Sequence, residues 1–115
     1  MGLDAGTAGD RDALLVAAGE LEDEIRRQIP RMDQERKLPG ELAETLADAG
    51  FFRMLAPAAV GGLEMEPLAG GEVVEALARI DGSTGWAAMV GAQWQWYVAL
   101  LPQEGQQRIF EQPNL

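Results

Sequence analysis

The chain has 115 residues, with nine Lys and Arg against nineteen Asp and Glu, and it contains neither cysteine nor histidine. Its net charge of −10 disfavours binding to nucleic acids and to anionic membrane surfaces. The missing side chains exclude disulfides, thiolate and imidazole metal sites, and histidine-dependent catalytic triads. An apolar fraction of 47% in 115 residues indicates one globular domain. The first residues lack a signal-peptide pattern, so we expect the protein in the cytoplasm.

The first predicted element is a long amphipathic helix. Residues 1–9 carry few apolar anchors, so we expect a disordered tail there and a helix that begins near Asp10. Apolar residues then recur at steps of three and four and draw one stripe on a helix: Leu14, Ala18, Leu21, Ile25, Ile29 and Met32. Pro30 removes one backbone hydrogen bond, so we expect it to kink or end this helix.

A second helix is expected to start at Pro39, which suits the first turn of a helix. Gly50 has the position of a left-handed stop, with Phe51 folding back onto the helix as an apolar contact. A compact connector follows. Its pair Gly61-Gly62 predicts a tight turn with positive φ and could also border a ligand cleft.

The remaining elements are also predicted to be helical. A third helix is expected over 67–80, with Asp81-Gly82 ending it and Ser83 capping the next. The fourth, over about 84–101, is apolar on nearly every side, which is typical of a buried central helix or of a membrane span. The acidic amphipathic helices around it favour burial. A short polar helix starts at Pro102, so we predict an all-α fold of about five helices packed around a central apolar helix.

Several motifs, weak one by one, occur together in a specific order and spacing. They are Arg36-Lys37-Leu38-Pro39, Glu41-Leu42, Ala49-Gly50-Phe51-Phe52, Gly61-Gly62, Glu72-Val73-Val74-Glu75, Asp81 and Gly85-Trp86. Taken together, this pattern resembles the amino-terminal helical domain of acyl-CoA dehydrogenases. The resemblance covers about residues 10–112, so we expect residues 10–115 to form that domain.

The resemblance implies a larger flavoprotein oxidoreductase. Members of the family have an FAD-binding β-domain and a C-terminal helical domain after the first domain, and most are homotetramers. Flavin binding and the carboxylate base of the dehydrogenases would then lie outside this chain. We therefore expect no catalytic residue, cofactor-binding residue or metal ligand here, and we expect the isolated chain to be inactive and to hold no flavin.

Two branches of the family stay open. The dehydrogenases act on acyl-CoA, with an electron-transfer flavoprotein as a possible partner. The segments 31–39 and 81–86, followed by an aromatic-rich helix, instead resemble the flavin-dependent monooxygenases. Those enzymes hydroxylate aromatic or polyketide-like substrates with reduced flavin from a partner reductase. One departure is that Ala59-Val60 stand where the family usually has an acidic and an aromatic residue before the glycine pair.

The fourth predicted helix carries the candidate substrate-binding residues. They are aromatic, thioether and amide side chains: Met89, Gln93, Trp94, Trp96 and Tyr97. Rings that stack and one amide that orients by hydrogen bonding suit a planar organic ligand. Gln93 would only orient, because an amide is no general base near neutral pH. The alternative is that these are core side chains and that Gln93 bonds to a backbone group.

Other polar features favour structural interpretations. The cluster Glu20, Glu22, Asp23 and Glu24 could hold a hard cation, but it is more typical of a solvated helix face. The pair Arg26-Arg27 could contact CoA phosphates, although its surroundings are acidic. Ser83 has no histidine to activate it. An alternative function is a stand-alone helical module whose aromatic helix binds a partner helix or a second copy.

Overall fold

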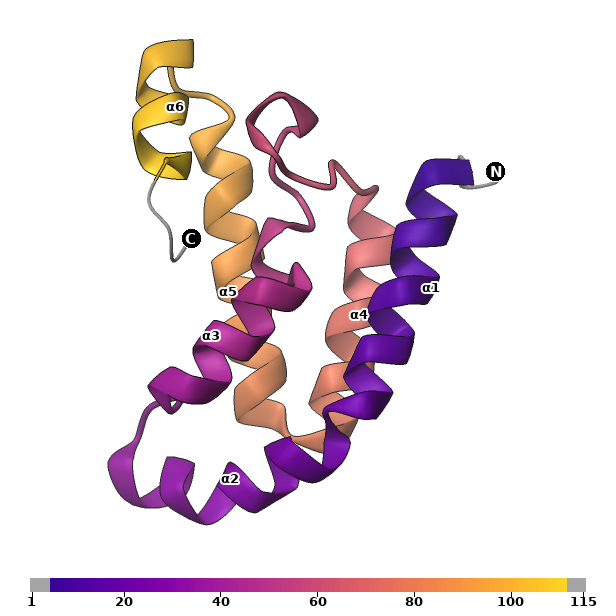
Figure 1. The fold of residues 1–115 in the computed structure, drawn as a ribbon, viewed down its shortest axis with the longest axis vertical. Helices are drawn as coiled ribbons and strands as arrows, with labels where there is room; N and C mark the ends of the chain where they lie inside the picture. The colour runs from indigo at the N-terminus through magenta and orange to yellow at the C-terminus, as the bar shows by residue number, and fades with distance from the viewer. Residues whose placement is uncertain (1–4, 112–115) are drawn as a thin grey trace.

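The computed structural model describes residues 5–111, and every regular element in that range is helical. The elements, in chain order, are α1 (Ala5–Glu20), α2 (Glu22–Glu35), α3 (Gly40–Ala49), the short 3₁₀ helices η1 (Phe51–Arg53) and η2 (Ala58–Val60), α4 (Pro67–Ile80), α5 (Gly82–Val98) and α6 (Gln103–Phe110). Figure 1 shows α1 beside α4, with α2 across one end of the molecule and α6 at the other. The all-α prediction is confirmed, with six α-helices within residues 5–111 in place of about five.

The first predicted helix is divided in two, but the division is not at Pro30. The chain changes direction at Leu21, and α2 then continues through Pro30 to Glu35 (Figure 1). The expected end of the helix at the proline is therefore wrong. Pro30 is exposed, whereas Ile25 and Met32 on either side of it are buried and hold α2 against the core. This packing outweighs the single backbone hydrogen bond that the proline removes.

The start of α1 also differs from the prediction. The helix begins at Ala5 rather than near Asp10, so residues 5–9 are not part of a tail, and Thr7 is buried. Residues 1–4 of the expected tail lie outside the described residues. Because α1 packs along α4, tertiary contact supports a segment that carries few large apolar side chains.

α3 and the connector after it follow the prediction. Gly50 ends α3 with a φ of 99°, and Phe51 is fully buried directly behind this stop. Gly61 has a φ of 87°, as expected for the tight turn. Gly62 is needed for space instead, because a Cβ at this position would lie 2.1 Å from the carbonyl oxygen of Ala56.

α4 and α5 form an antiparallel pair joined by a very short connection (Figure 1). The carboxylate of Asp81 accepts hydrogen bonds from the backbone N–H and the hydroxyl of Thr84, both at 2.8 Å. Asp81 is extended and therefore caps α5, whereas Ser83, the predicted cap, lies inside the first turn. The two helices approach closely, since a Cβ on Gly85 would lie 2.7 Å from the Ala78 Cβ.

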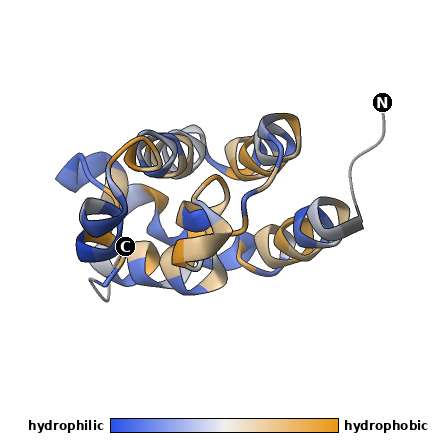
Figure 2. Cartoon of the chain, turned by 90° about the horizontal axis from the view of Figure 1, so that it is seen from above, coloured by the Kyte–Doolittle hydropathy of each residue, from blue (hydrophilic) through white to orange (hydrophobic). Residues whose placement is uncertain are grey.

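The core lies between α4, α5, the first three helices and the connector. Its largest fully buried apolar side chains are Phe51, Ile25, Leu42, Leu46, Met54, Leu77 and Val73. Seen end-on in Figure 2, several helices carry hydrophobic residues on one side and hydrophilic residues on the other. The fifth predicted helix is confirmed as α6. It is tied to the end of α5 by Gln106, whose side-chain amide donates to the carbonyls of Ala99 and Leu101 at 2.9 and 2.8 Å.

The composition of α5 predicts a helix that is buried on all sides, but the structure buries only part of its circumference. Its inner side packs on α4 and η1, but four large residues of its outer side are more than half exposed: Trp86, Trp94, Trp96 and Tyr97. The other described elements cover only part of the helix, so apolar composition alone does not enclose it. Within the described part of the chain, α5 and the other helices are too short or too polar to cross a membrane.

Candidate functional site

α5 presents three different sides. The inner side, against α4, is buried and consists mainly of small residues such as Ala88 and Ala92, and Gln95 is buried where this side meets the groove. The outer side carries the exposed aromatic residues. Between these two sides, a third one faces Phe52 of η1 and Ile109 of α6, and there the structure forms a groove.

The five residues predicted to bind substrate all lie on α5, but they do not line one cavity. Met89 is half-buried, while Gln93, Trp94, Trp96 and Tyr97 are exposed. Of the five, Trp94 lines the groove, and its ring meets the Tyr97 ring edge-on with centroids 5.8 Å apart. The alternative that these are core side chains is therefore wrong for the four exposed residues. Their role in substrate binding stays a prediction.

The groove has a volume of about 490 Å³ and an apolar lining. The side chains that form its walls include Phe52, Val90, Trp94, Val98 and Ile109, and none of its lining residues is charged. This volume is in the range of small-molecule sites, and the rings offer faces for stacking. A neutral, planar organic group is the ligand that such a surface complements.

Gly91 determines how closely one wall of the groove approaches α5. A Cβ on Gly91 would lie 2.6 Å from Cδ1 of Phe52, so the phenylalanine ring rests directly against the helix backbone. Any side chain at this position would push the ring away and change the width of the groove. The sequence alone shows Gly91 only as open space on the helix, because Phe52 reaches it from another element.

The polar residue of the groove is Gln95, which the sequence interpretation missed in favour of Gln93. Gln95 is 6% exposed, and its Oε1 is enclosed without a hydrogen-bond partner among the described residues. Gln93, two positions away, points to the solvent side of α5. The signal that could have found Gln95 is its spacing: it continues the buried series Thr84, Ala88 and Ala92 at steps of four, four and three.

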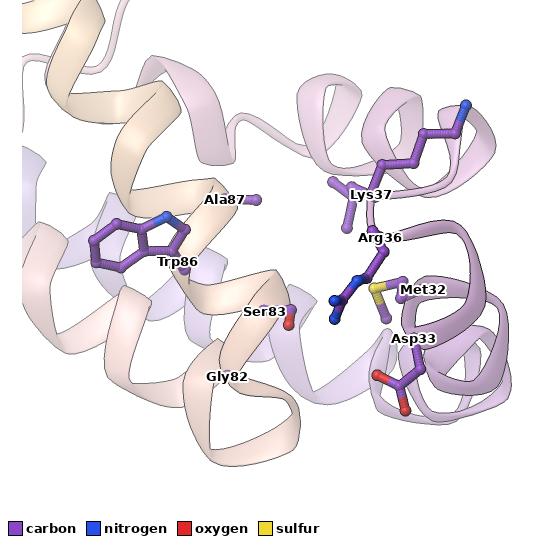
Figure 3. Close-up of a pocket in the computed structure, with 9 residues that line it drawn as sticks. Met32, Asp33, Arg36, Lys37, Gly82, Ser83, Trp86 and Ala87 are labelled. Carbon is purple, nitrogen blue, oxygen red and sulfur yellow. The ribbon is translucent and has the colours of Figure 1, made fainter.

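A second cavity, of about 610 Å³, lies between the end of α2 and the start of α5 (Figure 3). The guanidinium of Arg36 extends toward Ser83, whereas Lys37 points outward. Within residues 5–111, no ion pair joins either cation to a carboxylate. Trp86 lines both cavities, so this cavity, whose lining includes Arg36, Lys37 and Asp33, adjoins the uncharged groove.

An exposed ion pair connects α2 to α3 near this cavity. Arg31 reaches Glu41 of α3 at 2.9 Å and Glu35 of its own helix at 3.3 Å. Hydrogen bonds to Glu41 and then Glu35 raise the pKa of the Arg31 guanidinium above its ordinary value. Arg31 therefore stays charged throughout the physiological range and links α2 to α3 across the turn that carries Arg36.

Arg26 and Arg27 pair with two of the four carboxylates of the acidic cluster. Arg26 pairs with Glu22 at 3.4 Å, and Arg27 pairs with Glu24. In the described part of the chain, the structure contains no group of three or more acidic side chains arranged for a metal ion. These residues form the solvated helix face that the structural interpretation predicted.

Comparison with known proteins places this helical array in a family. Residues 11–110 match the family model described as "Acyl-CoA dehydrogenase, N-terminal domain". The chain belongs to the acyl-CoA dehydrogenase family. The structure is similar to the crystal structure of the HsaA monooxygenase from Mycobacterium tuberculosis, with a TM-score of 0.82 and 33% sequence identity. The similarity covers 90% of this chain and 27% of the HsaA chain. The fold predicted from the resemblance is confirmed.

The relatives of this acyl-CoA dehydrogenase family domain include several monooxygenases. The chain is 35% identical to the oxygenase subunit HsaA of a flavin-dependent monooxygenase from M. tuberculosis, over 91% of this chain and 27% of the relative. It is 34% identical to indole-3-acetate monooxygenase from Pseudomonas putida, over 69% and 20%. It is 30% identical to the oxygenase component of an FADH₂-dependent resorcinol hydroxylase from Rhizobium, over 78% and 22%. The chain thus spans about a quarter of their length.

Proposed function

We propose that this chain is the N-terminal domain of a flavin-dependent aromatic hydroxylase, and that the residues lining the groove beside α5 form one wall of the substrate pocket. The observation that carries the proposal is the groove itself, which combines exposed rings with a single carboxamide and has no charged residue in its lining. Indole-3-acetate and resorcinol, the compounds in the relatives' names, both contain planar aromatic rings. A ring of that kind matches the groove in shape and polarity.

The proposal divides the work between this chain and the rest of a longer protein. The helices of residues 5–111 would form the helical wall, and a β-domain and a C-terminal helical domain outside the chain would hold the flavin. The lining of the groove supports this division, because a flavin carries phosphate and the groove offers no cation to bind it. The full-length protein would be a homo-oligomer, with a tetramer as in most of the family.

In the proposed reaction, one oxygen atom of O₂ is inserted into an aromatic C–H bond and the other leaves as water. The two electrons would come from reduced flavin, bound outside this chain and provided by a partner reductase. The residues of this chain bind the ring, orient it and exclude water from its faces, because the groove walls are apolar. The relatives are named as monooxygenases or hydroxylases, and the groove is apolar, so hydroxylation of an aromatic ring is preferred over dehydrogenation of acyl-CoA.

The test is to follow the reading frame past Leu115 and to express the longer polypeptide. We expect it to bind reduced flavin and to hydroxylate resorcinol or indole-3-acetate when a flavin reductase and O₂ are supplied. Oxidation of an acyl-CoA by an electron acceptor, without use of O₂, would favour the dehydrogenase branch instead. A stop codon directly after Leu115 would overturn the proposal and favour a helical interaction module that uses the exposed aromatic side of α5.

A further inference from the structure

Gln95 is unusual among the polar side chains of the described residues. Three polar residues within 5–111 are buried: Thr7, Thr84 and Gln95. The Thr84 hydroxyl bonds to the Asp81 carboxylate at 2.8 Å, and Thr7 also has a polar interaction. Within the described residues, only Gln95 has a buried side-chain oxygen without a hydrogen-bond partner. Such groups are uncommon in folded proteins because burying them costs free energy, so this one calls for an explanation in terms of a missing partner.

The location of Gln95 suggests the kind of partner. Its side chain lines the uncharged groove, together with the rings of Trp94 and Phe52. The unpaired atom is a hydrogen-bond acceptor, so a complementary ligand atom must be a donor. The terminal torsion of a glutamine is broad, which lets the carboxamide turn its oxygen toward a ligand in the groove. The surrounding rings require the rest of the ligand to be flat and apolar.

We propose that Gln95, and not Gln93, is the residue that orients the substrate. Its Oε1 accepts a hydrogen bond from a hydroxyl or ring N–H of an aromatic compound whose ring lies between Trp94 and Phe52. The substrate class in this statement rests on the proposed function. The role of Gln95 itself rests on its burial, its unpaired oxygen and its place in the groove.

The first experiment compares two probes on the 115-residue chain. Resorcinol carries two hydroxyl donors on a benzene ring, and 1,3-dimethoxybenzene has the same ring without donors. Titrations are followed by ¹H–¹⁵N NMR through the Gln95 side-chain amide and the Trp94 indole N–H. We expect resorcinol to shift both signals and to bind about three- to tenfold more tightly, which corresponds to one hydrogen bond. Equal affinity of the two probes, or no shift with either, would overturn the inference.

The second experiment uses matched variants. Gln95→Met keeps an unbranched side chain but removes the acceptor, and Gln93→Met makes the same change at the exposed position two residues away. We expect the difference between the probes to disappear in Gln95→Met and to persist in Gln93→Met. The melting temperature of Gln95→Met should stay the same or rise, because an unpaired buried amide is removed. If Gln95 had only a structural role, the Gln95→Met variant would have a lower melting temperature than the unmodified chain.

These outcomes separate the inference from the proposed function. If Gln93→Met and not Gln95→Met removes the preference for the donor probe, the inference is wrong while the function still stands. If the donor probe binds through Gln95 but the longer polypeptide neither binds reduced flavin nor consumes O₂, the proposed function is wrong while the assignment of Gln95 stands.

Discussion

The two sides of α5 differ in residue size as well as in burial. The inner side, against α4, is built from small residues such as Gly85, Ala88 and Ala92, which are buried. The outer side carries indole and phenol rings, and Trp86 and Trp94 are each 66% exposed. Folded proteins usually bury their largest apolar side chains, so the arrangement in this helix is the reverse of the common one.

This difference separates stability from recognition. On the inner side, small residues let α4 and α5 approach closely, and the fold depends on that contact. On the outer side and in the groove, the rings contribute little to the core and remain available for a ligand or for another part of a longer protein. Substitutions on the two sides should therefore affect different measurements.

The largest expected effect is a loss of stability from truncating a core residue of α4, the helix against which the inner side of α5 packs. Leu77 of α4 is fully buried, and Leu77→Ala should lower the free energy of unfolding by about 2–5 kcal/mol. Leu68→Ala is the matched control on the same helix, because Leu68 is exposed, and it should change stability by less than about 0.5 kcal/mol. Urea denaturation measures both. Similar losses in the two variants would contradict the assigned core.

A smaller effect is expected from filling the space between α4 and α5. In Gly85→Ala the new Cβ would lie 2.7 Å from the Ala78 Cβ and 2.8 Å from its Cα, so the helices must separate. The expected cost is about 1–3 kcal/mol. Gly71→Ala, in α4 with no atom near the new Cβ, should instead stabilise by about 0.5–1 kcal/mol. Thermal unfolding would show shifts of opposite sign, and a stabilising Gly85→Ala would contradict the close approach.

The cap of α5 gives the next prediction. Asp81→Ala removes the acceptor for the Thr84 N–H and hydroxyl and should lower stability by about 1 kcal/mol. Ser83→Ala is the control and should have an effect below about 0.5 kcal/mol, because Ser83 is exposed and does not cap the helix. The same urea titrations apply. A larger loss for the serine variant would restore Ser83 as the cap.

Much of the fold could be predicted because its signals are local. Pro67 and Asp81 bound α4, and Gly50 ends α3, each through backbone preferences that act within a few residues. The bend at Leu21 could not be predicted in the same way. It depends on α1 packing along α4 and on Ile25 reaching the core, and these contacts join distant parts of the chain.

The sequence singled out the helix that borders the groove, but it pointed to Gln93, which is exposed, and not to Gln95, which lines the groove. Large aromatic residues usually mark the buried side of a helix, and here they mark the exposed side, so their spacing drew attention to Gln93. The small residues that precede Gln95 at helical spacing indicate the true inner side. The groove itself was not predictable from α5, because Phe52 and Ile109 come from other elements.

The last prediction concerns Trp94, whose ring lines the groove. Its truncation should change stability least of all these variants but should clearly weaken ligand binding. Trp94→Ala should alter the free energy of unfolding by less than about 1 kcal/mol, since the ring is mostly exposed and its main aromatic contact is the edge of Tyr97. Its affinity for resorcinol should nevertheless fall by about three- to tenfold, because one stacking surface is lost. NMR titration and thermal unfolding of the same sample measure both quantities.

Trp96→Ala is the control for this last prediction, because Trp96 is also an exposed indole of α5 but does not line the groove. Its resorcinol affinity should match that of the unmodified chain. An equal loss in both variants would mean that the probe binds the outer side of α5 without selecting the groove. A loss confined to Trp94 would show that exposed rings on one helix are not equivalent, and that the wall shared with Phe52 and Gln95 is the part that recognises the ligand.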